Sequence, residues 1–192
     1  MADGATKETD FRMSAVSETS PQTSTAPRTH DVIFSAFELI ASANPTAEDY
    51  LKAAELLDRV GAKPMDITGA DKVSLWQSRA VDLDPALKND IAVFRGRVKG
   101  PAYREFELLP GQSDVISEVF YAAELASISI KPNANAISLM VQEQDEDLDP
   151  VCDYGKVNTV ALCEWTPMWT APYDIRVTNH GVKPVSYLLI SN

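Results

Sequence analysis

The chain contains few of the residues from which most catalytic and metal sites are built. Its 192 residues include two histidines and two cysteines, whose spacing fits no common zinc site. Phosphate-binding loops, dinucleotide-binding glycine motifs and the Gly-x-Ser-x-Gly elbow are absent. Cys163 and His180 are the one pair that suits nucleophilic catalysis, but no third residue that would orient the histidine can be specified. A buried structural thiol is the favoured interpretation of Cys163, so the sequence predicts a protein that is not an enzyme.

Long apolar runs and basic charge are also scarce. No segment approaches the roughly 20 apolar residues of a membrane-spanning helix, so no membrane insertion is expected. The formal net charge is −11, and residues 101–192 carry 13 acidic against 5 basic side chains. Such a surface repels phosphate groups, so nucleic-acid binding is not expected. Cations and basic protein surfaces are the expected partners.

The first residues lack the apolar stretch of a secretory signal. The sequence therefore favours a cytoplasmic protein, with an extracellular location as the alternative. Cys152 and Cys163 are eleven residues apart, and a hairpin would bring them together as a disulfide in an oxidising compartment. In a reducing cytosol they remain two free thiols, which is the interpretation that the missing signal favours.

Residues 1–29 include 12 serine, threonine or proline residues and few large apolar ones. Such a segment cannot offset the entropy lost when it is ordered, so we predict a flexible arm. Phe11, Met13 and Val16 interrupt its polar sequence. They are the candidate residues for binding a partner or a neighbouring subunit, and the alternative is a plain solvated tail.

Residues 30–100 have the apolar period of helices. The stripe from Val32 to Ile40 predicts a first helix, which ends near Asn44 and Pro45. Thr46, followed three residues later by Asp49, is a typical helix start, and Gly61 is a typical end. These two helices are expected to form an antiparallel hairpin.

The rest of the helical region gives weaker signals. Residues 71–80, around Trp76, predict a short helix. Asp84 followed by Pro85 predicts a further helix, because an N-cap residue and a first-turn proline often begin one. Leu87, Ile91 and Phe94 would face inward, and the end of this helix would carry basic residues that oppose the helix dipole, namely Arg95, Arg97 and Lys99.

Residues 101–192 change to the period of two that is typical of strands, so we place a domain boundary at Pro101. Apolar and polar residues alternate as in an antiparallel sheet with one buried face. The fold class is therefore predicted as α+β, with a helical hairpin region before an antiparallel, jelly-roll-like β-sandwich. About seven strands are expected, near 103–109, 115–122, 126–131, 136–142, 157–164, 173–179 and 185–190.

An acidic segment separates two of these strands. Glu143 to Asp153 holds six carboxylates in eleven residues with no basic residue among them. A calcium ion would relieve the repulsion, and the metal ligands would be Asp145, Asp147, Asp149 and Asp153. Calcium is the only cofactor for which the sequence gives a reason. The alternative is a solvated hairpin loop that keeps the edge of the sheet from aggregating.

Two tryptophans, Trp165 and Trp169, lie on either side of Pro167. This spacing suits a bend between two strands. An exposed indole face can stack on a sugar ring, but packing in the core is the favoured interpretation. Trp165 continues the face of Ala161 and Cys163.

The β-region resembles bacterial pre-peptidase C-terminal-type domains over about residues 103–192. The resemblance rests on Phe120 to Ile130, Ile137 to Val141, the acid-rich loop with Cys152, and the segment from Cys163 to Asn179. It implies a small, non-catalytic β-sandwich of the kind often appended to secreted hydrolases, in some relatives associated with calcium or binding to matrix.

The sequence thus predicts a non-enzymatic structural or protein-interaction module. It would bind or assemble with a protein partner, or with further copies of itself, through its arm, helices and β-sandwich. The alternative is a calcium-modulated accessory domain that binds a ligand or matrix.

Overall fold

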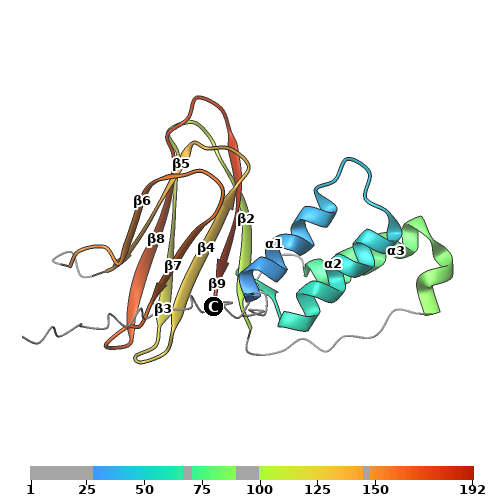
Figure 1. Ribbon diagram of the computed structural model, residues 1–192, viewed down its shortest axis with the longest axis horizontal. Coiled ribbons are helices and arrows are strands. Elements are labelled where there is room, and N and C mark those ends of the chain that lie inside the picture. Colours follow the sequence, from blue (N-terminus) through green and yellow to red (C-terminus); the bar gives the residue numbers. More distant parts are fainter. Residues whose placement is uncertain (1–27, 67–70, 90–99, 145–147) are drawn as a thin grey trace, which may run out of the picture.

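A computed structural model of the chain describes residues 28–66, 71–89, 100–144 and 148–192. Within them, three α-helices precede two β-sheets that lie face to face (Figure 1). The helices pack on one side of this sandwich, beside strands β2 and β9. The α+β prediction is confirmed. None of the helices in these ranges is long and apolar enough to cross a membrane.

Helices α1 (Thr29–Ile40) and α2 (Ala47–Val60) form where the periodicity predicted them. The Thr46 hydroxyl accepts a hydrogen bond from the Asp49 amide at 3.2 Å, and the Asp49 carboxylate accepts one from the Thr46 amide at 2.9 Å. These two bonds satisfy amides that the first turn leaves without partners, and the bonds from Thr46 hold the pKa of Asp49 below its ordinary value. Gly61, with a φ of 67°, ends α2 in the left-handed conformation that favours glycine.

Helix α3 (Lys72–Leu83) is longer than the helix predicted around Trp76. Asp71 caps it by accepting from the Val73 amide at 3.1 Å. The helix predicted to follow Asp84 differs from the structure, which has a short 3-10 helix at Pro85–Asn89. The Asp84 carboxylate accepts from the Ala86 amide at 3.0 Å, so this aspartate closes a turn instead of capping an α-helix. Residues 90–99, with the predicted basic end, lie outside the described ranges.

The helices are joined to the sandwich by a shared hydrophobic cluster. Ile33, Phe34 and Leu57 are buried in it together with residues of β2 and β9, namely Tyr103, Leu188 and Ile190. Gly100, at the predicted boundary, packs on the backbone of Gly61. A Cβ atom at Gly100 would lie 2.1 Å from the Gly61 carbonyl oxygen, so this close approach requires glycine.

Two sheets form the sandwich. The first sheet has the order β1-β2-β9-β4-β7 and lies under the helices, and the second sheet has the order β3-β8-β5-β6. Successive strands from β2 onward enter the sheets in the pattern of a jelly roll. The strands are β1 (Lys63–Pro64), β2 (Ala102–Leu108), β3 (Ser113–Phe120), β4 (Ala126–Pro132), β5 (Ile137–Glu143), β6 (Cys152–Val157), β7 (Ala161–Trp165), β8 (Ala171–Asn179) and β9 (Val185–Ser191).

The strand predicted at 157–164 is only partly correct, because it covers most of β7 and misses β6 except for its last residue. The structure divides this region into β6 and β7, which belong to different sheets. Strand β6 contains Asp153, Gly155 and Lys156, so it lacks the apolar alternation that identified the other strands. Its inward side is provided by Cys152 and Tyr154, which pack against the core.

The predicted free thiols are wrong. Cys152 and Cys163 form a disulfide that joins β6 to β7, with their Cα atoms 6.0 Å apart. The Tyr154 hydroxyl donates to the Leu162 carbonyl at 2.6 Å and connects the same two strands. The spacing of the two cysteines could not decide between free thiols and a disulfide. What brings them together is the jelly-roll crossover, which places the β6 and β7 edges of the two sheets side by side.

Candidate functional site: an apolar end of the sandwich

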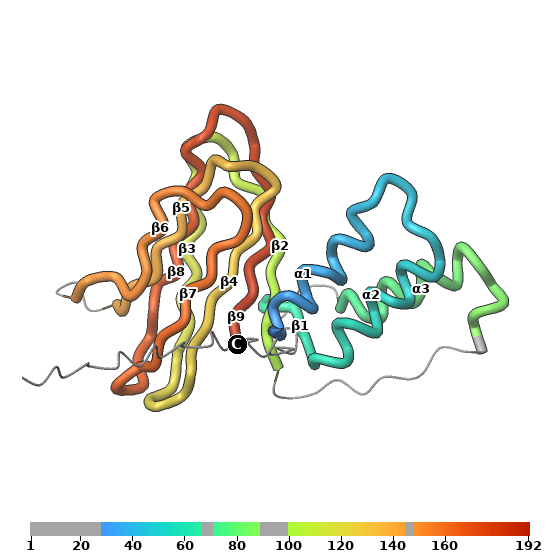
Figure 2. The backbone as a smooth tube through the Cα atoms, viewed as in Figure 1, coloured from blue at the N-terminus to red at the C-terminus, as the bar shows by residue number. Residues whose placement is uncertain are grey.

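Large apolar side chains gather in the open at one end of the sandwich. The β3–β4 turn (residues 121–125) and the β7–β8 turn (residues 166–170) lie beside each other at the lower end in Figure 2. The Ala123 amide donates to the Pro167 carbonyl at 2.9 Å, and the Ala122 amide donates to the Thr170 hydroxyl at 3.1 Å. Four large apolar side chains are exposed on these two turns, and we call them the turn-end surface. Their exposed fractions are 61% for Tyr121, 60% for Leu125, 85% for Met168 and 51% for Trp169.

A cluster of three aromatic rings lies beneath the turn-end surface. Phe120, Trp165 and Tyr173 lie with ring centroids 4.8 to 5.7 Å apart. Glu143 connects this cluster to the exposed Trp169, because its carboxylate accepts from the Trp169 indole N–H at 2.5 Å and from the Tyr173 hydroxyl at 3.2 Å. Burial raises the pKa of Tyr173, and the negative charge of Glu143 adds to this effect.

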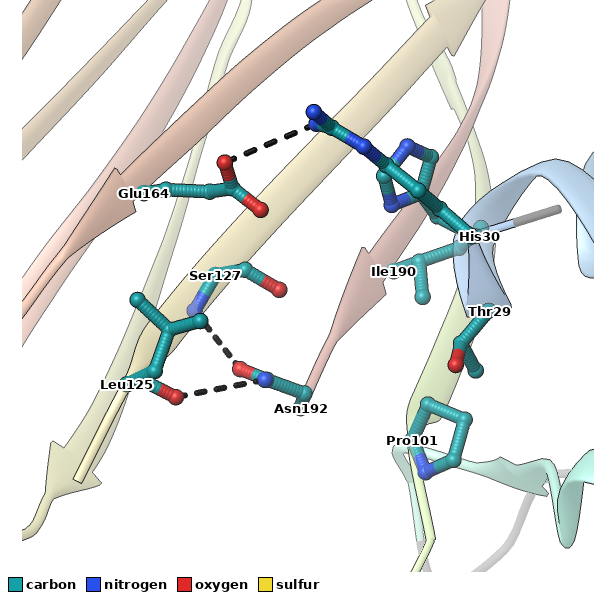
Figure 3. Close-up of a pocket in the computed structure, with 9 residues that line it drawn as sticks. Thr29, His30, Pro101, Leu125, Ser127, Glu164, Ile190 and Asn192 are labelled. Atoms are coloured by element: carbon teal, nitrogen blue, oxygen red, sulfur yellow. Dashed lines mark hydrogen bonds and ion pairs between the residues drawn. The ribbon is translucent and has the colours of Figure 1, made fainter. Parts of the chain in front are cut away.

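Two clefts lie next to the turn-end surface and share Leu125 and Asn192 as lining residues. One has a volume of about 620 Å³, and its wall includes Val119 and Tyr121. The other has a volume of about 410 Å³ and lies between the start of α1 and strands β4 and β7 (Figure 3). Clefts of this size accept side chains or small ligands.

The smaller cleft has polar groups on both of its sides. An ion pair between Arg28 and Glu164, 3.5 Å apart, spans it from the start of α1 to β7 (Figure 3). On the other side, the Asn192 side chain accepts from the Ser127 amide at 2.6 Å and donates to the Leu125 carbonyl at 3.3 Å. These bonds fix the cleft wall that carries Leu125. The cleft therefore forms a polar margin beside the apolar turn-end surface.

The predicted calcium ligands are only partly described. Asp145 and Asp147 lie outside the described ranges, while Asp149 and Asp153 are exposed. In the parts of the chain that the structure describes, no three His, Cys, Asp or Glu side chains group as metal ligands would. Calcium binding by Asp145, Asp147, Asp149 and Asp153 stays a prediction.

The other predicted sites have different outcomes. Phe11, Met13 and Val16 lie outside the described ranges, so their role in partner binding stays a prediction. The catalytic pairing considered for Cys163 and His180 is excluded, because Cys163 is fully buried and disulfide-bonded. The Nε2 atom of His180 instead lies 2.8 Å from the Ser138 hydroxyl, with which it shares a hydrogen bond.

The expectation that both tryptophans pack in the core holds for only one of them. Trp165 packs against the core with Phe120 and Tyr173, as expected from the face that it shares with Cys163. Trp169 is half exposed and belongs to the turn-end surface. Packing in the core is therefore the correct interpretation of Trp165 and the wrong one of Trp169.

Sequence reasoning did not identify Tyr121, Leu125 and Met168. The sequence does contain a weak signal, because each lies in or beside a turn, where large apolar residues are unusual. Their proximity depends on hydrogen bonds between two turns that are far apart in the chain.

Comparisons with known proteins identify no family. No family model matches the sequence, and no curated protein matches it. Among solved structures, the chain is similar to the pre-peptidase C-terminal domain of a collagenase from Bacillus anthracis. That match has 17% identity and a TM-score of 0.39, and covers 46% of this chain and 87% of the other.

Two further matches are comparable. A periplasmic inhibitor of g-type lysozyme from Aeromonas hydrophila matches with 11% identity and a TM-score of 0.36, covering 48% of this chain and 84% of the other. A structure described as a CBM4 matches with 10% identity and a TM-score of 0.32, covering 46% and 82%. The β-sandwich expected from the resemblance is present in this chain, and membership of the pre-peptidase C-terminal family stays a prediction.

Proposed function

We propose that the chain is a non-enzymatic interaction module that binds a protein partner through the turn-end surface. The observation that carries this proposal is the exposure of four large apolar side chains on two turns that are tied together by hydrogen bonds. Contiguous exposed apolar surface on a water-soluble domain commonly marks a site of interaction.

The chemistry of the turn-end surface resembles that of protein interfaces. Tyrosine and tryptophan are enriched among the residues that dominate binding energy, and both occur here. Trp169 is oriented by its bond to Glu143, so little side-chain entropy remains to be lost when a partner binds. The Arg28–Glu164 pair lies at the margin, in keeping with an apolar centre and a polar rim.

Charge narrows the kind of partner. Glu124 lies within one of the turns and Glu143 lies against Trp169, while the four residues of the turn-end surface are uncharged. A protein surface with apolar side chains at its centre and Lys or Arg around them would be complementary. Its binding should weaken as the salt concentration rises, because salt screens the pairs at the rim.

A matched pair of double variants tests the proposal. Leu125→Ser with Met168→Ser removes apolar area from the turn-end surface. Leu109→Ser with Val182→Ser removes two exposed apolar side chains from the loops at the opposite end of the sandwich. Each protein, including wild type, is immobilised in equal amount, and the proteins retained from cells that produce it are quantified by mass spectrometry.

The expected result is a protein retained by wild type and by the Leu109/Val182 variant, but at least tenfold less by the Leu125/Met168 variant. Direct titration of that purified partner should show the same order. Equal retention by the two variants would contradict the proposal. Thermal unfolding of both variants is the control, because all four substituted side chains are exposed and the fold should not change.

A further inference from the structure

In the ranges that the structure describes, four strands form the edges of the two sheets, and three of them are protected. An edge strand exposes backbone groups that can pair with another chain, and proteins usually block this. The β1 edge is two residues long and contains Pro64. Strand β6 contains Gly155 and pairs with β5 through a register irregularity, and it is tied to the β7 edge by the disulfide.

Strand β3 differs from the other edges. It is eight residues long, pairs with β8 without a register shift from Ser113 to Phe120, and contains no lysine, proline or glycine. Its outward side exposes 45% of Val115 and 54% of Val119. A long, regular edge with exposed valines is the form that adds a further strand.

The inward side of β3 carries two acidic residues, and inward charge can also block an edge. Here both carboxylates are bonded within the same copy of the chain. Asp114 lies 3.4 Å from the Arg104 guanidinium and accepts from the Tyr187 hydroxyl. Glu118 accepts from the Ser191 hydroxyl. Because these carboxylates already have partners across the sandwich, they do not block the edge that β3 forms within the described residues.

Self-pairing of β3 is limited to a few registers. Directly opposite residues on antiparallel strands point to the same face, so the two-fold axis must pass midway between the two copies of one residue, on which the pairing is centred. Centred on Ile116, the pairing would place Asp114 opposite Glu118 of the second copy. Centred on Glu118, it would place the two copies of that glutamate opposite each other. Like charges directly opposite are destabilising.

Centred on Ser117, the pairing has no opposed charges. Val115 of each copy then lies opposite Val119 of the other, so the two exposed valines of each chain gain apolar neighbours. Asp114 lies opposite Phe120, and Ile116 lies opposite Glu118. Registers centred on Val115 or Val119 also avoid like charges, but they pair fewer residues of β3 and place only one of its two valines opposite a valine, so the register centred on Ser117 is favoured.

We propose that two copies of the chain dimerise by antiparallel pairing of their β3 strands about Ser117. The second sheet then continues across the two-fold axis into the second sheet of the other copy. This interface uses the same surface on both chains, as two-fold dimers do. One strand pair buries less than the area typical of stable complexes, so the dimer is expected to form reversibly with rising concentration.

The dimer goes beyond the function proposed above, and its interface adjoins the turn-end surface, because Val119 lines the larger cleft together with Tyr121. Because β3 runs in opposite directions in the two copies, the two turn-end surfaces would lie at opposite ends of the continuous sheet. A dimer of this form would bind two partners at once, which raises the avidity for a partner that is itself multivalent.

Sedimentation equilibrium over a range of concentrations is the first test. Wild type is expected to show a monomer–dimer equilibrium, and Val119→Lys is expected to raise the dissociation constant at least tenfold. Val182→Lys, at a residue 91% exposed on the β8–β9 loop, is the matched control and should leave the constant unchanged. A wild type that remains monomeric, or a Val119→Lys variant that dimerises as well as wild type, overturns the proposal.

Cysteine cross-linking tests the register separately. Ser117→Cys should form an intermolecular disulfide, because residue 117 lies opposite itself. Val115→Cys and Val119→Cys should each cross-link poorly alone and efficiently when the two variants are mixed. Efficient self-cross-linking of Val115→Cys, or none in Ser117→Cys, overturns the register. The native Cys152–Cys163 bond is retained in every variant, so the fold keeps its own cross-link.

Discussion

Single residues hold the two sheets together at the long sides of the sandwich. On one side the Cys152–Cys163 disulfide joins β6 to β7. On the other, Asp114 of β3 binds Arg104 of β2 and Tyr187 of β9. The core between these sides is apolar, so these few contacts provide the specific connections between the edges.

We expect the disulfide to make a large contribution to stability. Cross-linking residues eleven apart restricts the unfolded chain by about 3 kcal/mol on the loop-closure estimate. Cys152→Ala with Cys163→Ala should lower the free energy of unfolding in urea by that order. A reducing agent should have a similar effect on wild type and none on the double variant, and an unchanged wild type would contradict the expectation.

Tyr103 should make the free energy of unfolding fall as the pH rises into the alkaline range. Burial raises the pKa of its phenol to about 12, with nearby negative charge from Asp71 and Glu105 adding to the effect. In the unfolded chain the pKa of this phenol is about 10, so the stability gained by burying the neutral phenol is fully present below about pH 10. It is lost as the pH rises toward 12, by up to about 1.4 kcal/mol per pH unit.

The test compares urea unfolding of wild type and Tyr103→Phe at several alkaline pH values. At neutral pH the variant should be less stable by about 1 kcal/mol, because the hydroxyl accepts from the Lys72 amide at 3.1 Å. Above pH 10 this difference should shrink. Equal slopes in the two proteins would show that the Tyr103 phenol does not titrate as expected. Some slope should remain in the variant, since burial also raises the pKa of Tyr187.

At the scale of elements, the helices are defined by their ends. The capping box of Thr46 and Asp49 and the left-handed Gly61 fix the limits of α2. We expect Thr46→Ala to lower the free energy of unfolding by roughly 1 kcal/mol, because the Asp49 amide loses its acceptor. Ser42→Ala, in the loop before the helix, is the control and should change little. A loss equal to that of Thr46→Ala would contradict the capping role.

At the scale of the whole molecule, we expect the helices and the sandwich to unfold together. They share a cluster in which Ile33 and Leu57 pack near Leu188 and Ile190. The circular dichroism of the helices and the fluorescence of Trp165 and Trp169, which both belong to the sandwich, should therefore give the same denaturation midpoint. Fluorescence should be recorded in a Trp76→Phe background, because Trp76 belongs to the helical cluster.

The Leu188→Asp variant tests whether the shared cluster makes the helices and the sandwich unfold together. Leu188 faces the helices and is buried in their cluster, so a carboxylate there would be unpaired against apolar side chains. The helical signal should then be lost at a lower urea concentration than the sandwich signal. Two separate transitions in wild type would instead show that the predicted boundary at Pro101 divides independent units.

The sequence determined the elements that depend on neighbours along the chain. Helix periodicity, the cap at Thr46 and the stop at Gly61 are local signals, and they located α1 and α2 correctly. Alternation located most strands of the sandwich, because a strand with one buried face must alternate. It missed β6, whose residues alternate weakly, since Cys152 and Tyr154 are only partly buried and Val157 at its end is the one fully buried residue.

Tertiary structure decided what depends on residues far apart in the chain. The disulfide was one of two alternatives until the crossover from β6 to β7 brought the cysteines within bonding distance. Tyr121 and Trp169 belong to separate turns, and only hydrogen bonds between those turns make them one surface. Among the described residues, β3 likewise forms an edge only because the order of the strands leaves it outermost. Periodicity reports which face of an element is apolar, whereas packing and strand order determine whether that face is covered.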